Sequence, residues 1–175
     1  MIYVAPIHNP IPGAVRYISQ QLPNEFRGLV AVHQTKFDPR IALDKTRNQY
    51  NSTILLAELL QELPSKHAKI IGITEVDLFI PVLTFVFGEA QLNGNVAVAS
   101  SHRLRNSYYG LPENPDLVLE RLYKEAVHEL GHVFSLTHCD NYRCVMHAAT
   151  GVEELDLKNA AFCSACNSVL RSASF

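Results

Sequence analysis

The sequence has no long apolar run and no cluster of basic residues. None of its 175 residues lies in a stretch that approaches the roughly 20 apolar residues needed by a membrane-spanning helix. Its 15 basic side chains face 17 acidic ones, for a formal charge of −2, whereas surfaces that bind nucleic acids are strongly basic. The first residues also lack the basic start and apolar core of a secretion signal. We therefore expect a cytoplasmic protein with no membrane and no nucleic-acid partner.

Cysteine is scarce, and the four cysteines all lie between residues 139 and 166. Cys139 and Cys144 are separated by four residues, and Cys163 and Cys166 by two. In a secreted protein two disulfides would be the usual interpretation, but in a reducing cytoplasm these spacings favour a structural zinc bound by four thiolates. Disulfides and an iron–sulfur cluster remain alternatives. Because few large apolar residues follow Ser135, metal binding would supply much of the folding free energy of this segment.

The order of the predicted elements indicates an α/β protein. In sequence they are a strand over residues 2–7, a helix to about residue 22, a strand over 28–32, a loop over 37–49, a helix over 51–63, strands over 69–74, 81–87 and 95–100, and a long helix from 115. Strands that alternate with helices favour a mainly parallel sheet with right-handed crossovers. The last two strands are joined by a polar, glycine-containing link and favour an antiparallel edge. We expect a twisted mixed sheet, mostly parallel, with an antiparallel edge strand.

The start of the long helix is marked by Asn114, Pro115 and Asp116, which supply an N-cap, a proline at the first position and a carboxylate in the first turn. Apolar residues then recur at spacings of three and four and predict a buried stripe. A second, polar stripe includes Arg121 and Glu125. We expect this polar stripe to face a cleft.

The same helix carries a candidate metal site. His128 and His132 are four residues apart, so their rings lie one above the other on one face and can share a zinc ion. Glu129 follows the first histidine and is turned to the flank, where it can hold the attacking water as a general base. His138 is too far along for a straight helix, so the chain must bend back soon after Phe134. Three imidazoles then leave a fourth position open, as in catalytic zinc sites.

These residues resemble the extended zinc motif of the metzincin metallopeptidases, HExxHxxGxxH, in which a methionine lies beneath the metal. For this composition the three histidines and the glutamate would occur together by chance with a probability of about one in a thousand. Met146 fits the methionine of the clan. A cysteine directly after the third histidine, a Cys-x-Met over 144–146 and a Cys-x-x-Cys over 163–166 are similar to the archaemetzincins. Residues 73–79 and 85–90 are similar to that family as well.

The resemblance implies a metzincin-like fold, with a rim strand above the zinc helix that we place within residues 82–100. One departure concerns Ser135, which stands where the clan has glycine, at the point where the helix must end and reverse. Glycine tolerates a positive φ there. A serine in that conformation costs on the order of 1 kcal/mol, unless the chain leaves the helix by a different turn.

We expect residues 1–135 to form the catalytic part. Residues 136–175 would form a small C-terminal part with the third histidine, Met146 and the cysteines, and the two parts one structural unit. The implied function is zinc-dependent hydrolysis of peptides or proteins, with two zinc ions per chain. The alternatives are a zinc-stabilised module that binds peptides or proteins without cleaving them, and a redox protein using Cys163 and Cys166.

Three other polar residues, His102, His147 and Glu89, lie near these motifs in the sequence. His102 and His147 are expected to be ordinary neighbours of the site rather than members of it. Glu89 either holds a substrate amine or bonds the backbone at a turn.

Overall fold

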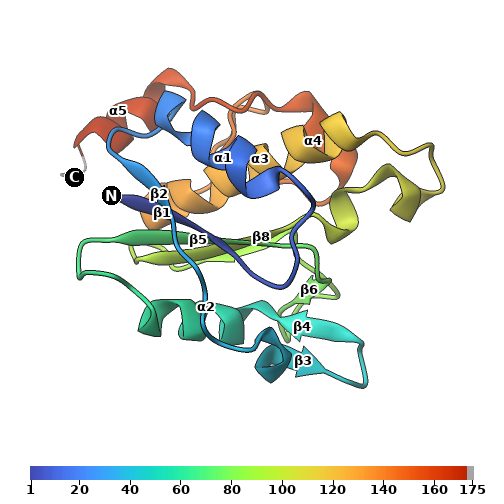
Figure 1. Ribbon diagram of the computed structural model, residues 1–175. Helices are drawn as coiled ribbons and strands as arrows, with labels where there is room; N and C mark the ends of the chain where they lie inside the picture. The colour runs from blue at the N-terminus through green and yellow to red at the C-terminus, as the bar shows by residue number, and fades with distance from the viewer. Residues whose placement is uncertain (173–175) are drawn as a thin grey trace.

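A five-stranded sheet forms the centre of the computed structural model, which describes residues 1–172 (Figure 1). In spatial order its strands are β2 (Val30–Val32), β1 (Ile2–Pro6), β5 (Lys69–Thr74), β8 (Val96–Ser100) and β7 (Gly88–Ala90). All neighbouring strands pair in parallel except β7, which is antiparallel to β8. The predicted fold class, a mostly parallel mixed sheet with an antiparallel edge strand, is confirmed.

Helices cover both faces of this sheet. Helices α1 (Ala14–Gln21) and α3 (Pro115–Val133) lie on one face and α2 (Ser52–Gln61) on the other, while the short helices α4 (Val152–Leu157) and α5 (Ser164–Ser172) lie on the side of α3 (Figure 1). The sheet therefore has two apolar cores. Four 3-10 turns also occur within the described residues: η1 (Leu22–Asn24), η2 (Pro39–Ala42), η3 (His102–Leu104) and η4 (Asn106–Tyr109).

The larger core packs α1, α3 and the C-terminal segment against the sheet. Leu122 and Leu130 of α3 are fully buried in it, as are Val145, Met146 and Leu155 from the segment after α3. Full burial of such side chains stabilises the fold by about 1.5–3 kcal/mol each. The C-terminal segment thus shares its core with the helix that carries the histidines.

The start of α3 follows the local sequence. The side chain of Asn114 accepts a hydrogen bond of 3.1 Å from the backbone N–H of Leu117, Pro115 occupies the first turn, and Asp116 adds a carboxylate there. These three residues satisfy or complement the free N–H groups of the first turn. The predicted start of the long helix is confirmed.

The prediction of a strand over residues 81–87 is wrong, because residues 80–86 form a loop and the edge strand is β7. The loop begins with a turn in which the N–H of Leu83 donates to the carbonyl of Ile80, and Pro81 has no N–H to give to a ladder. The carbonyls of Leu83 and Thr84 accept from side chains rather than from a strand. These long-range partners cannot be read from a local apolar pattern.

The predicted loop over residues 37–49 is also incomplete. It contains β3 (Leu43–Asp44) and the start of β4 (Gln49–Asn51), which pair with each other and, through β4, with β6 (Leu78–Phe79) in a second, three-stranded sheet. Strands of two or three residues are too short to show a period of two. They form because the partner strand, distant in sequence, lies beside them.

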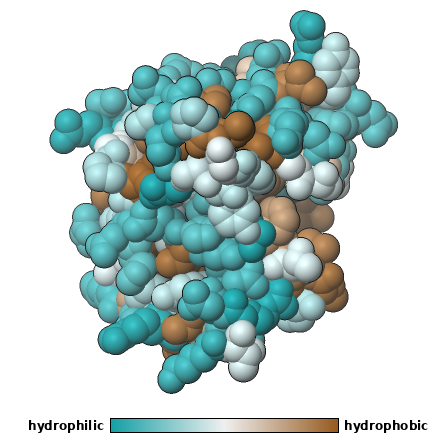
Figure 2. Space-filling model, turned by 90° about the vertical axis from the view of Figure 1, so that its right-hand side faces the viewer, coloured by the Kyte–Doolittle hydropathy of each residue, from teal (hydrophilic) through white to brown (hydrophobic). Residues whose placement is uncertain are grey.

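The face of the molecule drawn in Figure 2 is mainly polar, with hydrophobic side chains in scattered groups. Among residues 1–172, no helix combines the length and the apolar character needed to cross a membrane.

The prediction that Arg121 faces a cleft together with the rest of the polar stripe is wrong. Its guanidinium donates to both carboxylate oxygens of Asp156 at 2.7 and 2.6 Å, to the carbonyl of Leu104 at 2.8 Å and to the side-chain oxygen of Asn106 at 2.9 Å. Only 4% of the arginine side chain is exposed, against 37% of the aspartate. Arg121 therefore joins α3 to α4 and to the turns before α3.

We expect Arg121→Met to lower the free energy of unfolding by about 2–3 kcal/mol, because a buried carbonyl and a half-buried carboxylate lose their charged donor. Denaturant unfolding measures this change. Arg40→Met is the control: Arg40 and Asp38 form an exposed pair, whose loss is worth about 0.5 kcal/mol or less. Equal losses in the two variants would contradict this account of Arg121.

Candidate metal centres and active site

Three histidines converge at the C-terminal end of α3. His128 and His132 lie on the helix and His138 follows its end, and one ring nitrogen from each lies within 4.8 Å of the others. The Nε2 atoms of His128 and His132 are 3.1 Å apart. Two nitrogens bound to one zinc at about 2.1 Å and a tetrahedral angle lie roughly 3.4 Å apart. The structure brings together all three histidines singled out in the sequence, and their spacing fits a single zinc ion.

The outer nitrogens of two of these rings are held by backbone carbonyls. His128 Nδ1 lies 2.8 Å from the oxygen of Val145, and His132 Nδ1 lies 2.8 Å from the oxygen of Leu136. A carbonyl only accepts, so each Nδ1 carries the proton and each Nε2 keeps its lone pair for a metal. The pKa of His128 is lowered to about 3, mainly by burial and secondly by the positive charge of Lys158. Burial also lowers the pKa of His132, so both rings are neutral at neutral pH, as zinc ligands must be.

The bend that returns His138 to the helix occurs at Ser135. Its φ of 73° lies in the left-handed region, and the N–H of Leu136 donates to the carbonyl of Gly131 at 2.9 Å. The serine thus takes the conformation for which the clan uses glycine, rather than a different turn. Its hydroxyl donates to the side-chain oxygen of Asn93 at 2.8 Å, which offsets part of the cost of about 1 kcal/mol.

Met146 lies directly against the backbone of α3 between the two helical histidines. It is fully buried, and a Cβ added to Gly131 would lie 2.3 Å from its Sδ and 3.3 Å from Cε1 of Phe162. Only glycine allows this close approach of the methionine to the helix. Met146 therefore packs against the helix between His128 and His132, and its role as the methionine of the clan stays a prediction.

Glu129 lies between the histidines and the edge strand. It is 5% exposed, and a Cβ added to Gly88 of β7 would lie 2.7 Å from its Cγ. Burial raises the pKa of Glu129 well above its ordinary value, and the neighbouring Glu125 raises it further. A buried carboxylate with few partners of its own is a strong proton acceptor once ionised.

Two further charged residues near the site did not stand out as site residues in the sequence. Glu125 lies one turn before Glu129 on α3, and burial raises its pKa. Lys158 is 2% exposed and donates to the carbonyls of Val145 at 3.2 Å and His147 at 2.7 Å. The four-residue spacing of Glu125 and Glu129, which places them one helical turn apart, can be read from the sequence. No local pattern indicates Lys158, because its partners meet it only through the fold.

The histidines open onto a cavity of about 400 Å³. One side of it is formed by α3 together with His138, a second by residues 83–88, and a third by residues 148–150 and Lys158. The lining is Leu83, Thr84, Phe85, Val86, Phe87, Gly88, Glu125, His128, Glu129, His138, Ala148, Ala149, Thr150 and Lys158. A ligand in this cavity would touch Glu129 and two of the histidines.

The four cysteines form a second cluster. The sulfurs of Cys139, Cys144, Cys163 and Cys166 lie within 4.8 Å of one another, and no two are joined in a disulfide. Cys139 Sγ and Cys163 Sγ are 3.8 Å apart, close to the edge of a tetrahedron of thiolates at about 2.3 Å from zinc. The N–H of Cys166 lowers the pKa of Cys163 to about 7. This set of donors fits a tetrahedral metal, whereas disulfides would draw the sulfurs together in pairs.

The other polar residues considered in the sequence lie outside the histidine cluster. Glu89 accepts hydrogen bonds from the hydroxyls of Ser52 and Thr53, and so fastens β7 to the start of α2. His102 Nδ1 pairs with the carbonyl of Glu75, and His147 Nδ1 with that of Cys139.

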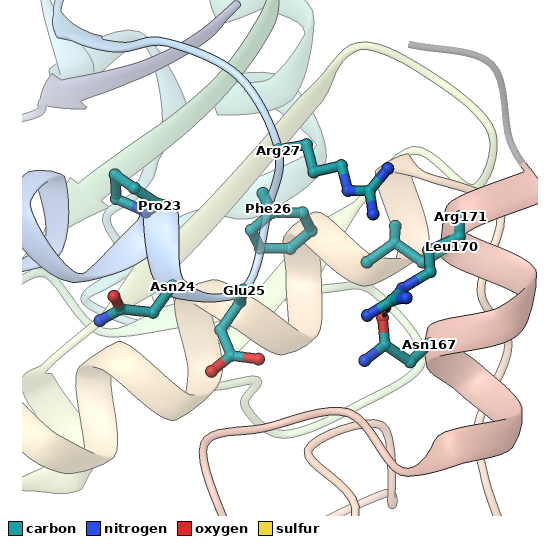
Figure 3. A pocket seen from close by; sticks show the side chains of 8 residues that line it. All are labelled: Pro23, Asn24, Glu25, Phe26, Arg27, Asn167, Leu170 and Arg171. Carbon is teal, nitrogen blue, oxygen red and sulfur yellow. Dashed lines mark hydrogen bonds between the residues drawn. The ribbon is translucent and has the colours of Figure 1, made fainter.

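A separate cavity of about 120 Å³ lies between residues 23–27 and α5 (Figure 3). Its polar side chains are engaged: Arg171 donates to Asn167 at 3.3 Å, and Glu25 accepts from the backbone of Phe162. Phe26 stacks on the ring of Phe134, with centroids 5.3 Å apart. Of these contacts, the one between Glu25 and Phe162 joins residues 23–27 to the segment before Cys163.

The sequence model of peptidase family M54 matches residues 33–172. Archaemetzincin from Haloquadratum walsbyi is 38% identical over 173 residues, which are 97% of this chain and 99% of that protein. The chain belongs to the archaemetzincins. Archaemetzincin from Methanocaldococcus jannaschii is 44% identical over 128 residues, which are 73% of this chain and 69% of that one.

Solved structures of archaemetzincins share the fold along nearly the whole chain. The structure from Methanopyrus kandleri has a TM-score of 0.84 at 33% identity, over 97% of this chain and 92% of that one. A zinc-dependent peptidase from Methanocorpusculum labreanum has a TM-score of 0.87 at 31% identity, over 97% of this chain and 100% of that one. As an archaemetzincin, the chain belongs to a family of zinc-dependent metallopeptidases.

In this archaemetzincin, we expect Gly131→Ala to lower the free energy of unfolding by about 1–2 kcal/mol. Displacement of Met146 and Phe162 costs about 1–3 kcal/mol, and the better helix propensity of alanine returns only part of that. Thermal or denaturant unfolding of the metal-loaded protein measures the change.

Gly151→Ala is the matched control. A Cβ at Gly151 would meet only the carboxylate end of Glu153, which can move, so the expected change is within about 0.5 kcal/mol. A Gly131→Ala protein as stable as this control would contradict the close contact between the helix and Met146.

Proposed function

We propose that this archaemetzincin hydrolyses peptide bonds with Glu129 as the general base and with a zinc ion held by His128, His132 and His138. The observation that carries the proposal is the convergence of three ring nitrogens within 4.8 Å, beside a buried carboxylate that lines the same cavity. Zinc, when bound, acidifies a water and polarises the scissile carbonyl.

The remaining steps belong to the protein's own side chains. The carboxylate of Glu129 orients the attacking water, takes its proton, and then delivers that proton to the leaving amine. The carbonyls of Val145 and Leu136 keep the rings of His128 and His132 neutral and fixed in direction.

The residues that line the cavity favour a peptide substrate with a large apolar side chain next to the scissile bond. Phe85, Phe87, Ala148 and Ala149 line the space beside Glu129. Strand β7 pairs with β8 on one side only, and its outer edge is suited to hydrogen bonding with an extended peptide. We therefore assign β7 as the rim strand expected from the family resemblance.

We also propose that the four cysteines hold a structural zinc, for two zinc ions per chain. Cys139 adjoins His138, and its N–H donates to the carbonyl of Met146 at 3.0 Å, so this metal would anchor both the third histidine and the methionine. Four unpaired thiols favour a reducing compartment, the cytoplasm. Of the predicted C-terminal part, residues 136–172 would then be a metal-stabilised extension of the catalytic part, and residues 173–175 lie outside the described residues.

A binding module without activity has less support than it had from the sequence. Its one supporting feature was Ser135, and this residue adopts the left-handed turn that places His138 beside the other histidines. A module that only binds has no need of a buried carboxylate in the position of Glu129.

We expect Glu129→Gln to retain zinc and to lose turnover by a factor of about 100 to 10,000, because the general base is removed without loss of a ligand. Cleavage of a mixed peptide library, followed by mass spectrometry with and without a hydroxamate chelator, measures this. Glu120→Gln is the control on the same helix, since Glu120 is exposed and pairs with Lys124. Undiminished cleavage by Glu129→Gln would reject the assigned base.

Elemental analysis should give two zinc ions per wild-type chain. Cys166→Ser should bind about one, with a less stable C-terminal segment, because metal binding and folding are coupled in tetrathiolate sites. A wild-type protein that holds a single zinc, with all four thiols free to react with a thiol reagent, would overturn the structural site.

A further inference from the structure

One wall of the cavity beside the histidines is a loop, residues 80–86, which we call the wall loop and which ends in an isolated bridge between Val86 and Leu78. Leu83, Thr84, Phe85 and Val86 line the cavity, while Val82 at the tip is 83% exposed. Two backbone hydrogen bonds are local to this part of the chain: the N–H of Leu83 donates to the carbonyl of Ile80, and the N–H of Val86 donates to the carbonyl of Leu78. A loop so sparsely bonded to itself depends on outside contacts for its position.

Those contacts come from the β3–β4 hairpin, residues 43–51, which is remote in sequence and does not line the cavity. Arg47 Nη2 donates to the carbonyls of Leu83 at 3.1 Å and Thr84 at 3.0 Å. Gln49 Nε2 donates to the same carbonyl of Thr84 at 3.0 Å. Hydrogen bonds from a guanidinium are stronger than those between neutral groups. The hairpin therefore holds the backbone of the wall loop at the two residues before Phe85.

The two side chains that hold the loop are themselves fixed. Arg47 Nε donates to Gln49 Oε1 at 2.9 Å, and its guanidinium lies 4.1 Å from the centre of the Phe79 ring. Gln49 is 7% exposed and also donates to Asp77 at 2.9 Å. Asp77 in turn accepts from Arg103 at 2.6 and 2.7 Å.

Arg103 of this network also contacts a side chain of the cavity wall. The Arg103 guanidinium lies 4.3 Å from the centre of the Phe85 ring, and that ring is part of the cavity wall. The backbone of the wall loop and its aromatic side chain are thus both positioned by polar groups that touch neither the histidines nor Glu129.

We propose that Arg47 and Gln49 are positioning residues that determine substrate specificity, by fixing the wall loop through the carbonyls of Leu83 and Thr84. The inference rests on the proposed peptidase function and adds to it the element that selects the substrate side chain. A rigid wall discriminates between side chains by their fit, whereas a mobile wall accepts them more equally. The chemistry at Glu129 is unaffected, so the effect falls on KM and on selectivity rather than on kcat.

The test is Arg47→Met, which keeps an apolar stem over Phe79 and removes the donors to the loop. Three peptides are compared that differ only in carrying Phe, Leu or Ala directly after the scissile bond. We expect the ratio of kcat/KM for the Phe peptide over the Ala peptide to fall about tenfold, through a higher KM for the Phe peptide. Arg47→Lys, which retains one charged donor, should give an intermediate ratio.

Arg40→Met is the matched control, because Arg40 is also an arginine next to the hairpin, but its ion pair within residues 1–172 is with Asp38, its exposed neighbour. Its ratio should equal that of the wild type. Hydrogen exchange at the amides of residues 82–86 should be faster in Arg47→Met and unchanged in Arg40→Met. A purely stabilising role for Arg47 would lower the rates for all three peptides together and leave their ratio unchanged, which would overturn the inference.

The selectivity is also measured without turnover, by calorimetric binding of peptide hydroxamates that carry the same Phe, Leu and Ala side chains. The affinity ratio of Phe over Ala should fall in Arg47→Met in parallel with the kinetic ratio. If the wild type binds these compounds but cleaves no peptide, the proposed hydrolysis fails while the affinity ratio still decides the role of Arg47. An unchanged affinity ratio in Arg47→Met, or in Arg47→Lys should Arg47→Met not fold, overturns the inference.

Discussion

The hydrogen bond from His128 to the carbonyl of Val145, at 2.8 Å, is the contact on which the rest of the site depends. This hydrogen bond joins α3 to the segment that follows it, and fixes both the tautomer and the direction of the His128 ring. Val145 is in position to accept it because Met146, its neighbour, packs against Gly131 in the last turn of the helix. The direction in which His128 Nε2 points is therefore a consequence of core packing, and not of helix geometry alone.

The end of the helix and the cysteine cluster complete this arrangement. Ser135, in the left-handed conformation, turns the chain back toward the helix. The hydrogen bond from the N–H of Cys139 to the carbonyl of Met146 closes the loop that contains His138. His138 thus lies between a helix terminus and a set of four thiols that fits a metal. Leu136, Val145 and Met146 already pack this loop into the core beside α3, and a metal at the thiols would add to that stabilisation.

The features encoded within a few residues could be predicted from the sequence. Asn114 and its neighbours mark the start of α3, and the spacing of His128 and His132 predicted their common face, with Glu129 at its flank. Residues 80–86 and 43–51 could not be predicted, because their conformation comes from bonds between segments 36 residues apart, such as the one from Arg47 to Leu83. Burial of the two glutamates of α3 likewise follows from the strand and the C-terminal segment packed around them, rather than from the helix pattern.

We propose that neutral imidazoles and thiolates of this chain bind zinc at two separate centres, one of which is open to substrate. X-ray absorption at the zinc edge of the metal-loaded protein tests it most directly. The account predicts nitrogen or oxygen neighbours at about 2.0–2.1 Å together with sulfur neighbours at about 2.3 Å, and outer-shell scattering from imidazole rings. A spectrum with sulfur neighbours alone, and no imidazole contribution, would contradict it.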